Sequence, residues 1–177
     1  CRKRGIDPKG PDAPKSLIKA LEDFFNIEEG DLSTVTAAHR SMLAKKIKFV
    51  ATGNREETNY IIMDEATGQS ALTMQNTILS LHKKNKIDMP FTQGEYNQGG
   101  TAVLSFCDYQ LIISKQHKDC TIADDITSED YCFTIVKRER PTGQKKQSVW
   151  KYLVSKKHDD GRVELFHFRA DSLEIGP

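Results

Sequence analysis

The chain has 177 residues, of which 37% are hydrophobic and 29% are charged, a composition typical of a globular protein with one apolar core. Its 26 basic and 25 acidic residues give a formal net charge of +1, which excludes a strong overall positive field for attracting nucleic acid. It has no apolar run of about 20 residues, as a membrane-spanning helix requires, and no signal-peptide pattern at its start. We therefore expect a single cytoplasmic domain over residues 1–177 without membrane contact.

The N-terminal half is predicted to contain two helices and a β-hairpin. Residues 14–25 have apolar side chains at helical spacing and Pro14 at a position suited to a first turn. A less regular pattern predicts a second helix over residues 33–45. The β-rich runs "IKFVATG" and "TNYIIMDEA" flank the polar turn "NREE", which favours antiparallel pairing and brings Asp64 to the end of a strand.

The C-terminal half is predicted to be mostly β-sheet. Helical spacing returns over residues 72–82, a long polar connection follows, and a short helix is expected from Thr101. Four strand-like runs come next, separated in part by the turn sequences "PTGQKK" and "HDDG"; they are residues 109–116, 131–140, 147–155 and 162–169. This order predicts an α+β fold, a two-layer sandwich with helices on one face of a mostly antiparallel sheet.

The cysteines are predicted to be reduced thiols. They stand at positions 1, 107, 120 and 132, with no C-x-x-C pair and no regular spacing. The five histidines are scattered in the same way, so we expect no metal site in this chain. The chain also begins with Cys1 rather than Met and opens on the polar "CRKRG", from which we expect it to be part of a longer protein.

Asp64 is a candidate ligand-binding residue. In "IIMDEATGQS" it ends an apolar strand just before a turn that contains Gly68. A carboxylate in such a place can accept a hydrogen bond from an amino group on a planar ring, which is a way to select adenine. The alternative is that Asp64 only caps the turn, and these residues by themselves favour that role.

The glycine-rich segment "FTQGEYNQGG" is a candidate phosphate site. Amides at the start of a helix lack internal partners and favour anions, and glycines allow phosphate oxygens to approach the backbone. The alternative is a flexible hinge without a ligand. The sequence has neither the G-x-x-x-x-G-K-[ST] pattern of a P-loop nor a G-x-G-x-x-G dinucleotide fingerprint between a strand and a helix.

In this order and spacing, the strand-end aspartate, the glycine four residues later, the polar connection and "GEYNQGG" resemble the nucleotide-binding elements of the GHKL superfamily. This is the Bergerat-fold group of gyrase, the ninety-kilodalton heat-shock chaperone, histidine kinases and MutL. The chain is most similar to bacterial ATP-binding proteins of this superfamily that carry a segment like "LSLHKKNKIDMPFTQGEYNQGGTAVLSFC", and the likeness extends from "CRKRGIDP" to "DSLEI". It implies an incomplete Bergerat-type fold with residues 83–100 as lid and glycine-rich loop.

The resemblance also implies which residues bind ATP. Asp64 would bind the adenine amino group, and Gly68 would let the backbone pass close under the base. Ala66 stands where family members usually have a glycine, and Asn97 where many relatives have one. The remaining residues would lie in the lid or face the phosphates at the helix start; they are Lys84, Asn85, Gly94, Asn97, Gly99, Gly100 and Thr101.

Hydrolysis in the superfamily depends on a helix with an E-x-x-x-N pattern, whose Glu activates water and whose Asn holds magnesium. The chain lacks this pattern, and the resemblance places that helix before Cys1. We therefore expect ATP as the ligand, a magnesium ligand outside this chain, and no identified catalytic residue within it. In the intact protein, hydrolysis would drive lid closure and a signal to other domains, and a homodimer is compatible with this expectation.

Two other functions stay open at the level of sequence. The first is a non-catalytic α+β interaction module that binds a partner protein through exposed hairpins and no nucleotide. The second is nucleic-acid binding by the basic hairpin at residues 137–146, for which a solvated hairpin is the simpler explanation.

Overall fold

The computed structural model describes residues 1, 4–80, 89–92, 103, 106–121, 124–143 and 148–173. These ranges contain three α-helices and eight strands in an α+β arrangement. In chain order they are α1 (Leu17–Phe25), α2 (Ala37–Ala44), β1 (Ile47–Gly53), β2 (Thr58–Asp64), α3 (Ala71–Met74), β3 (Tyr109–Lys115), β4 (Tyr131–Glu139), β5 (Val149–Tyr152), β6 (Lys156–Lys157), β7 (Val163–Glu164) and β8 (Phe166–Phe168).

The first two helices confirm the predicted pattern, with shifted starts. The Ser16 hydroxyl caps α1 by accepting a hydrogen bond from the Lys19 amide at 3.1 Å, so Pro14 precedes the helix and does not lie in its first turn as expected. Asn26 ends α1 in the left-handed region, with φ of 59°. The Thr36 side chain caps α2 in the same way, within the predicted range 33–45.

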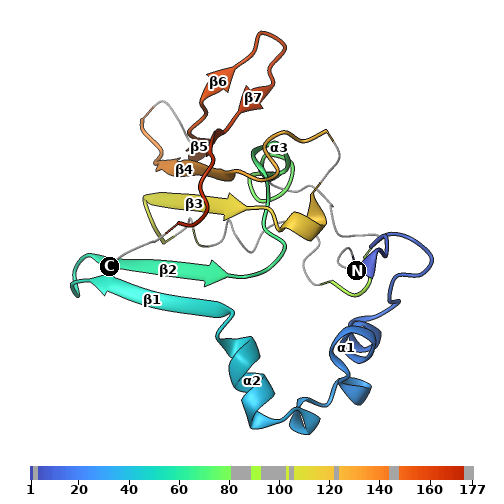
Figure 1. The fold of residues 1–177 in the computed structure, drawn as a ribbon. Helices are drawn as coiled ribbons and strands as arrows, with labels where there is room; N and C mark the ends of the chain where they lie inside the picture. Colours follow the sequence, from blue (N-terminus) through green and yellow to red (C-terminus); the bar gives the residue numbers. More distant parts are fainter. Residues whose placement is uncertain are drawn as a thin grey trace.

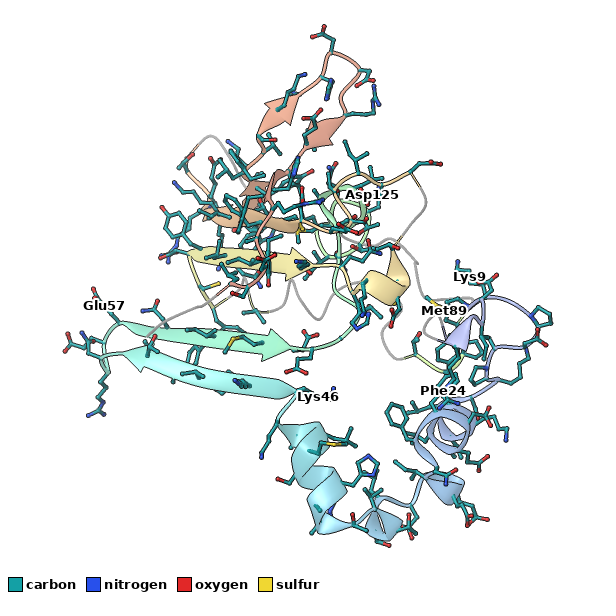
Figure 2. The ribbon with its side chains drawn as sticks, viewed as in Figure 1. Lys9, Phe24, Lys46, Glu57, Met89 and Asp125 are labelled. Atoms are coloured by element: carbon teal, nitrogen blue, oxygen red, sulfur yellow. The ribbon has the colours of Figure 1, made fainter. Side chains whose placement is uncertain are left out.

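The predicted hairpin is confirmed. Strands β1 and β2 pair antiparallel along their whole length, and Ile47 lies opposite Asp64. In the turn between them, the Asn54 side chain accepts hydrogen bonds from the amides of Glu56 and Glu57 at 2.9 and 2.8 Å. Figure 2 shows Lys46 and Glu57 at the two ends of this hairpin.

The larger sheet has four strands. Strand β4 pairs with β3, with β5 through its second half and with β8 through its first three residues. Strands β6 and β7 form a separate hairpin that projects from one end of the molecule (Figure 1). Every strand pair in the described ranges is antiparallel.

Three predicted elements are much shorter than expected, and one of them is the strand at 147–155, of which β5 covers only Val149–Tyr152. The predicted helix at 72–82 is helical only over Ala71–Met74, and turns follow to Leu79; residues 81 and 82 lie outside the described ranges. The Thr77 hydroxyl bonds to the Thr73 carbonyl at 2.8 Å and to the Gln69 side chain, and such side-chain bonds compete with a continuing helix. The predicted strand at 162–169 is interrupted at Leu165, which is buried in the core.

The core lies between α3 and the four-stranded sheet. Its buried members are Ala71 and Met74 from α3, Cys132 from β4, and Leu165. In the part of the chain that the structure describes, α3 is the helix on this sheet, whereas α1 and α2 lie at the other end of the molecule (Figure 1). The α+β composition is therefore confirmed, and the arrangement of helices on one face of a common sheet stays a prediction.

The predicted helix from Thr101 lies outside the described residues, apart from Val103 and Phe106. None of the described helices has the length and apolar character needed to cross a membrane.

Candidate functional site

Asp64 is held by the turn that follows β2. Its Oδ1 accepts a hydrogen bond from the Ala66 amide at 2.9 Å, so the capping role considered from the sequence is present. The carboxylate is exposed, and the described residues place no donor on its second oxygen, Oδ2. One oxygen thus fixes the side chain and the other can accept a bond from a ligand.

An apolar stripe shares the face of the hairpin that carries Asp64. Residues opposite each other in an antiparallel pair point to the same face, and the register places Ile47, Phe49, Tyr60 and Ile62 on the face of Asp64. Each of these four side chains is between 62% and 66% exposed. The rings of Phe49 and Tyr60 stack with centroids 5.5 Å apart. We call these four residues the hairpin stripe.

The hairpin stripe was not identified from the sequence. The signal was present, because apolar residues alternate at 47 and 49 and again at 60 and 62. However, the intervening positions 48, 50, 61 and 63 are mostly apolar too. Only the register shows which set shares a face with Asp64.

Gly68 has a structural role of its own. Its φ is +60°, and a Cβ added to it would lie 1.8 Å from the backbone oxygen of Lys115. The neighbouring residues bind the end of β3: the Thr67 carbonyl accepts a bond from the His117 amide at 2.8 Å, and the Gln69 amide donates to Ser114 Oγ at 2.9 Å. The close approach that requires a glycine here is therefore to the chain's own β3.

The described residues cover only part of the predicted site. Asp64 and Ala66 meet in one turn, and Gly68 packs on β3. The other predicted residues lie outside the described ranges; they are Lys84, Asn85, Gly94, Asn97, Gly99, Gly100 and Thr101.

A hollow elsewhere in the molecule contains none of the predicted site residues. It has a volume of about 320 Å³ and is lined by residues 5–8 and 119–121. Two carboxylates line it, but Asp7 accepts a bond from the Lys9 amide at 3.0 Å, and Asp119 lies 3.6 Å from the His117 ring. No group of three or more residues suited to hold a metal ion occurs among the described residues.

A buried polar network joins α3 to the loop before β4. Asp125, which lies beside α3 in Figure 2, accepts hydrogen bonds from Ser70 Oγ and from the amide and hydroxyl of Thr127, the last two at 3.0 and 2.7 Å. Burial by itself would raise the pKa of Asp125, but these bonds outweigh it and hold the pKa below its usual value. Ser70 is fully buried at the N-cap of α3, so its hydroxyl serves the fold and not as a nucleophile.

A second carboxylate continues this network. Asp130 Oδ2 lies 2.9 Å from His167 Nδ1, and its Oδ1 accepts a bond from Arg169 Nε at 2.9 Å. The bond to His167, with a smaller contribution from Arg169, lowers the pKa of Asp130. Both partners come from the end of the chain, so this carboxylate ties β8 and the segment after it to the start of β4.

The cysteines differ in burial, and this predicts their reactivity. Cys132 is fully buried, and desolvation raises the pKa of its thiol to about 11. Its thiolate is then about 100-fold rarer at neutral pH than that of an ordinary thiol. In native protein treated with a thiol reagent, we expect the partly exposed Cys1 and Cys107 to react first and Cys132 only after unfolding. Peptide mapping by mass spectrometry checks this, and labelling of native Cys132 as fast as Cys1 would contradict it.

The geometry around Asp64 offers a fixed acceptor at the end of an exposed apolar surface. This arrangement can take a flat ring that carries an amino group. A comparison with protein-family models, curated proteins and solved structures found no match to this chain in any of the three.

Proposed function

We propose that the chain binds ATP and that Asp64 accepts a hydrogen bond from the adenine amino group. One observation carries this proposal: the turn fixes the Asp64 carboxylate through Oδ1 and leaves Oδ2 without a donor from the described residues, at the end of the hairpin stripe. A carboxylate held in one orientation before the ligand arrives loses little freedom on binding.

The hairpin stripe supplies the apolar surface that a purine needs. Ile47 lies opposite Asp64 and Ile62 precedes it by two residues on the same face. A purine bonded to Asp64 Oδ2 would cover one or both isoleucines, whose side chains are largely exposed without a ligand. In this proposal Gly68 keeps the turn packed on β3 and so fixes the position of Asp64, which belongs to the same turn.

The phosphate part of the proposal rests on the sequence. Gly94, Asn97, Gly99, Gly100 and Thr101 would offer backbone amides to the phosphates, with Lys84 and Asn85 in the lid. We include the Bergerat-type sandwich and membership of the GHKL superfamily in the same proposal. Magnesium-dependent hydrolysis, lid closure and signalling to other domains then belong to the intact protein, where residues outside this chain supply the general base and the metal ligand.

The test is a titration of the full gene product with a fluorescent ATP analogue in the presence of magnesium. Asp64→Asn replaces the acceptor with an amide, and we expect its affinity for ATP to fall about tenfold to a hundredfold, the range for a lost bond to a charged group. Guanine has an acceptor where adenine has an amino group, so the variant should lose discrimination against GTP. Asp160→Asn is the matched control, because Asp160 Oδ1 accepts a similar turn bond from the Arg162 amide at 3.0 Å on a distant hairpin.

An Asp64→Asn variant that binds ATP as tightly as the unmodified protein, with the same preference over GTP, would contradict the proposed role of Asp64. The absence of any ATP binding by the unmodified protein would overturn the proposed function itself. The exposed hairpin stripe then favours the alternative function, an interaction module that binds a partner protein without a nucleotide.

A further inference from the structure

The outer edge of β1 has no strand paired with it among the described residues. Strands β1 and β2 form a sheet of two strands, and in the described residues no third strand pairs with either of them. β2 lies on the side of the hairpin toward β3, whereas β1 faces outward (Figure 1). A two-stranded sheet is marginally stable in water, and a third strand or a covering layer stabilises it.

This edge carries few of the features that prevent strands from pairing between molecules. Proteins protect such edges with proline, several charges, bulges or short strands. β1 has seven residues, "IKFVATG", with no proline and one charged residue, Lys48. Its register with β2 is continuous from Ile47 to Gly53, so it has no bulge. Among the described residues, nothing pairs with this edge along its whole length.

Two copies of β1 can pair with each other without opposing like charges. Two copies that pair antiparallel over all seven residues must place the middle residue, Val50, opposite its own counterpart. This register sets Lys48 opposite Thr52 of the second copy and Phe49 opposite Ala51 of the second copy, so no like charges face each other. A shorter overlap centred on Lys48 would oppose two lysines, which disfavours it.

We propose that β1 pairs with β1 of a second copy of this chain around a two-fold axis at Val50. The pairing joins two hairpins into one four-stranded antiparallel sheet in the order β2, β1, β1 of the second copy and β2 of the second copy. Because the axis is perpendicular to the sheet, the hairpin stripes of both copies lie on the same face. Each Asp64 stays at an outer strand of this sheet, so pairing leaves both copies of the nucleotide site proposed above open.

The test measures mass by light scattering and analytical ultracentrifugation over a range of protein concentrations. We expect the unmodified full gene product to form dimers that dissociate on dilution. Val50→Lys and Val50→Glu each place like charges opposite each other, and each should weaken the dimer about tenfold or more. An equal mixture of the two variants pairs Lys with Glu and should restore the dimer. Ile126→Lys is the control, since Ile126 is exposed and lies outside the hairpin.

Three results would overturn the proposal: an unmodified protein that stays monomeric at millimolar concentration, single variants that dimerise like the unmodified protein, or a mixture that stays monomeric. Circular dichroism of each single variant checks that the hairpin still folds, since Val50 is only 39% exposed. The readout is mass and not nucleotide binding, so a failure here is distinct from a failure of the proposed ATP site.

Discussion

Gly68→Ala is expected to destabilise the protein by about 3 kcal/mol or more. An alanine at φ of +60° costs about 1–2 kcal/mol from backbone strain. Its Cβ would also lie 1.8 Å from the Lys115 oxygen, so the turn must move away from β3. That movement breaks the bonds from His117 to Thr67 and from Gln69 to Ser114, each worth about 1 kcal/mol. Unfolding in urea, followed by circular dichroism, measures the loss.

Gly161→Ala is the matched control for this prediction. Gly161 also has a positive φ, of +85°, but nothing lies within 4 Å of the position where a Cβ would be added. It therefore tests backbone strain without the steric overlap, and we expect a loss of about 1–2 kcal/mol. Equal losses in the two variants would show that the contact between Gly68 and β3 adds nothing to stability.

The hairpin was predictable because its signals are local. Two β-rich runs around "NREE" predict β1 and β2; the first matches Ile47–Gly53, the second extends two residues past the end of β2 at Asp64, and Asn54 forms the turn bonds typical of its residue type. The position of Asp64 at the end of a strand follows from the same pattern. Side-chain caps from Ser16 and Thr36 likewise explain why α1 and α2 begin at Leu17 and Ala37.

The packing of α3 and Leu165 was not predictable, because it depends on distant parts of the chain. Apolar spacing over 72–82 favours a longer helix, but hydrogen bonds from Thr77 oppose its continuation after Met74. The run at 162–169 alternates like one strand. However, Leu165 packs into the core formed by α3 and β4, and this divides the run into β7 and β8. The bonds of Thr77 are local, but the partners of Leu165 in α3 and β4 are far away in sequence, so periodicity alone could not reveal the interruption at Leu165.

In the candidate site, too, contacts between residues far apart in sequence could not be predicted from local patterns. The resemblance implies that Gly68 lets the backbone pass close under the base, and this stays a prediction; the close approach that the structure shows is to the backbone of Lys115 in β3, which no sequence pattern indicated. The bond beside it joins residues 45 positions apart, Gln69 and Ser114, a distance over which sequence pattern carries no information on pairing. The hairpin stripe also required the register, because both faces of β1 and β2 contain apolar residues.

The hydrogen bonds of Asp125 are expected to contribute as much to the free energy of unfolding as the apolar core beside them. Asp125→Ala removes the acceptor of the half-buried Thr127 amide and the carboxylate partner of the fully buried Ser70 hydroxyl, which then has only Thr73 Oγ1, at 3.1 Å, as a side-chain partner. Each unsatisfied buried group costs about 1–3 kcal/mol, so we expect a loss of about 3–5 kcal/mol in the free energy of unfolding. Asp125→Asn keeps one acceptor oxygen and should lose less. Urea unfolding of both variants at neutral pH measures the difference.

Acid should weaken the unmodified protein through the same carboxylates. The folded-state pKa values of Asp125 and Asp130 lie below the usual value of about 3.9, because hydrogen bonds favour their ionised forms. Their stabilisation is therefore complete above about pH 5 and is lost as the pH falls through the lowered pKa values. Asp125→Asn cannot titrate, so its stability should fall less between pH 5 and acid than that of the unmodified protein.

Asp31→Ala is the control that shows how much of the stability loss in Asp125→Ala comes from burial and how much from local hydrogen bonds. Asp31 accepts bonds from the amide and hydroxyl of Ser33, both at 2.8 Å, just as Asp125 accepts from Thr127, but Asp31 is exposed. Water can replace the carboxylate there, so we expect a much smaller loss than for Asp125→Ala. If Asp31→Ala and Asp125→Ala cost the same, local turn bonds alone explain both carboxylates. A much larger cost at Asp125 means that the buried bond to Ser70 holds α3 against the loop before β4.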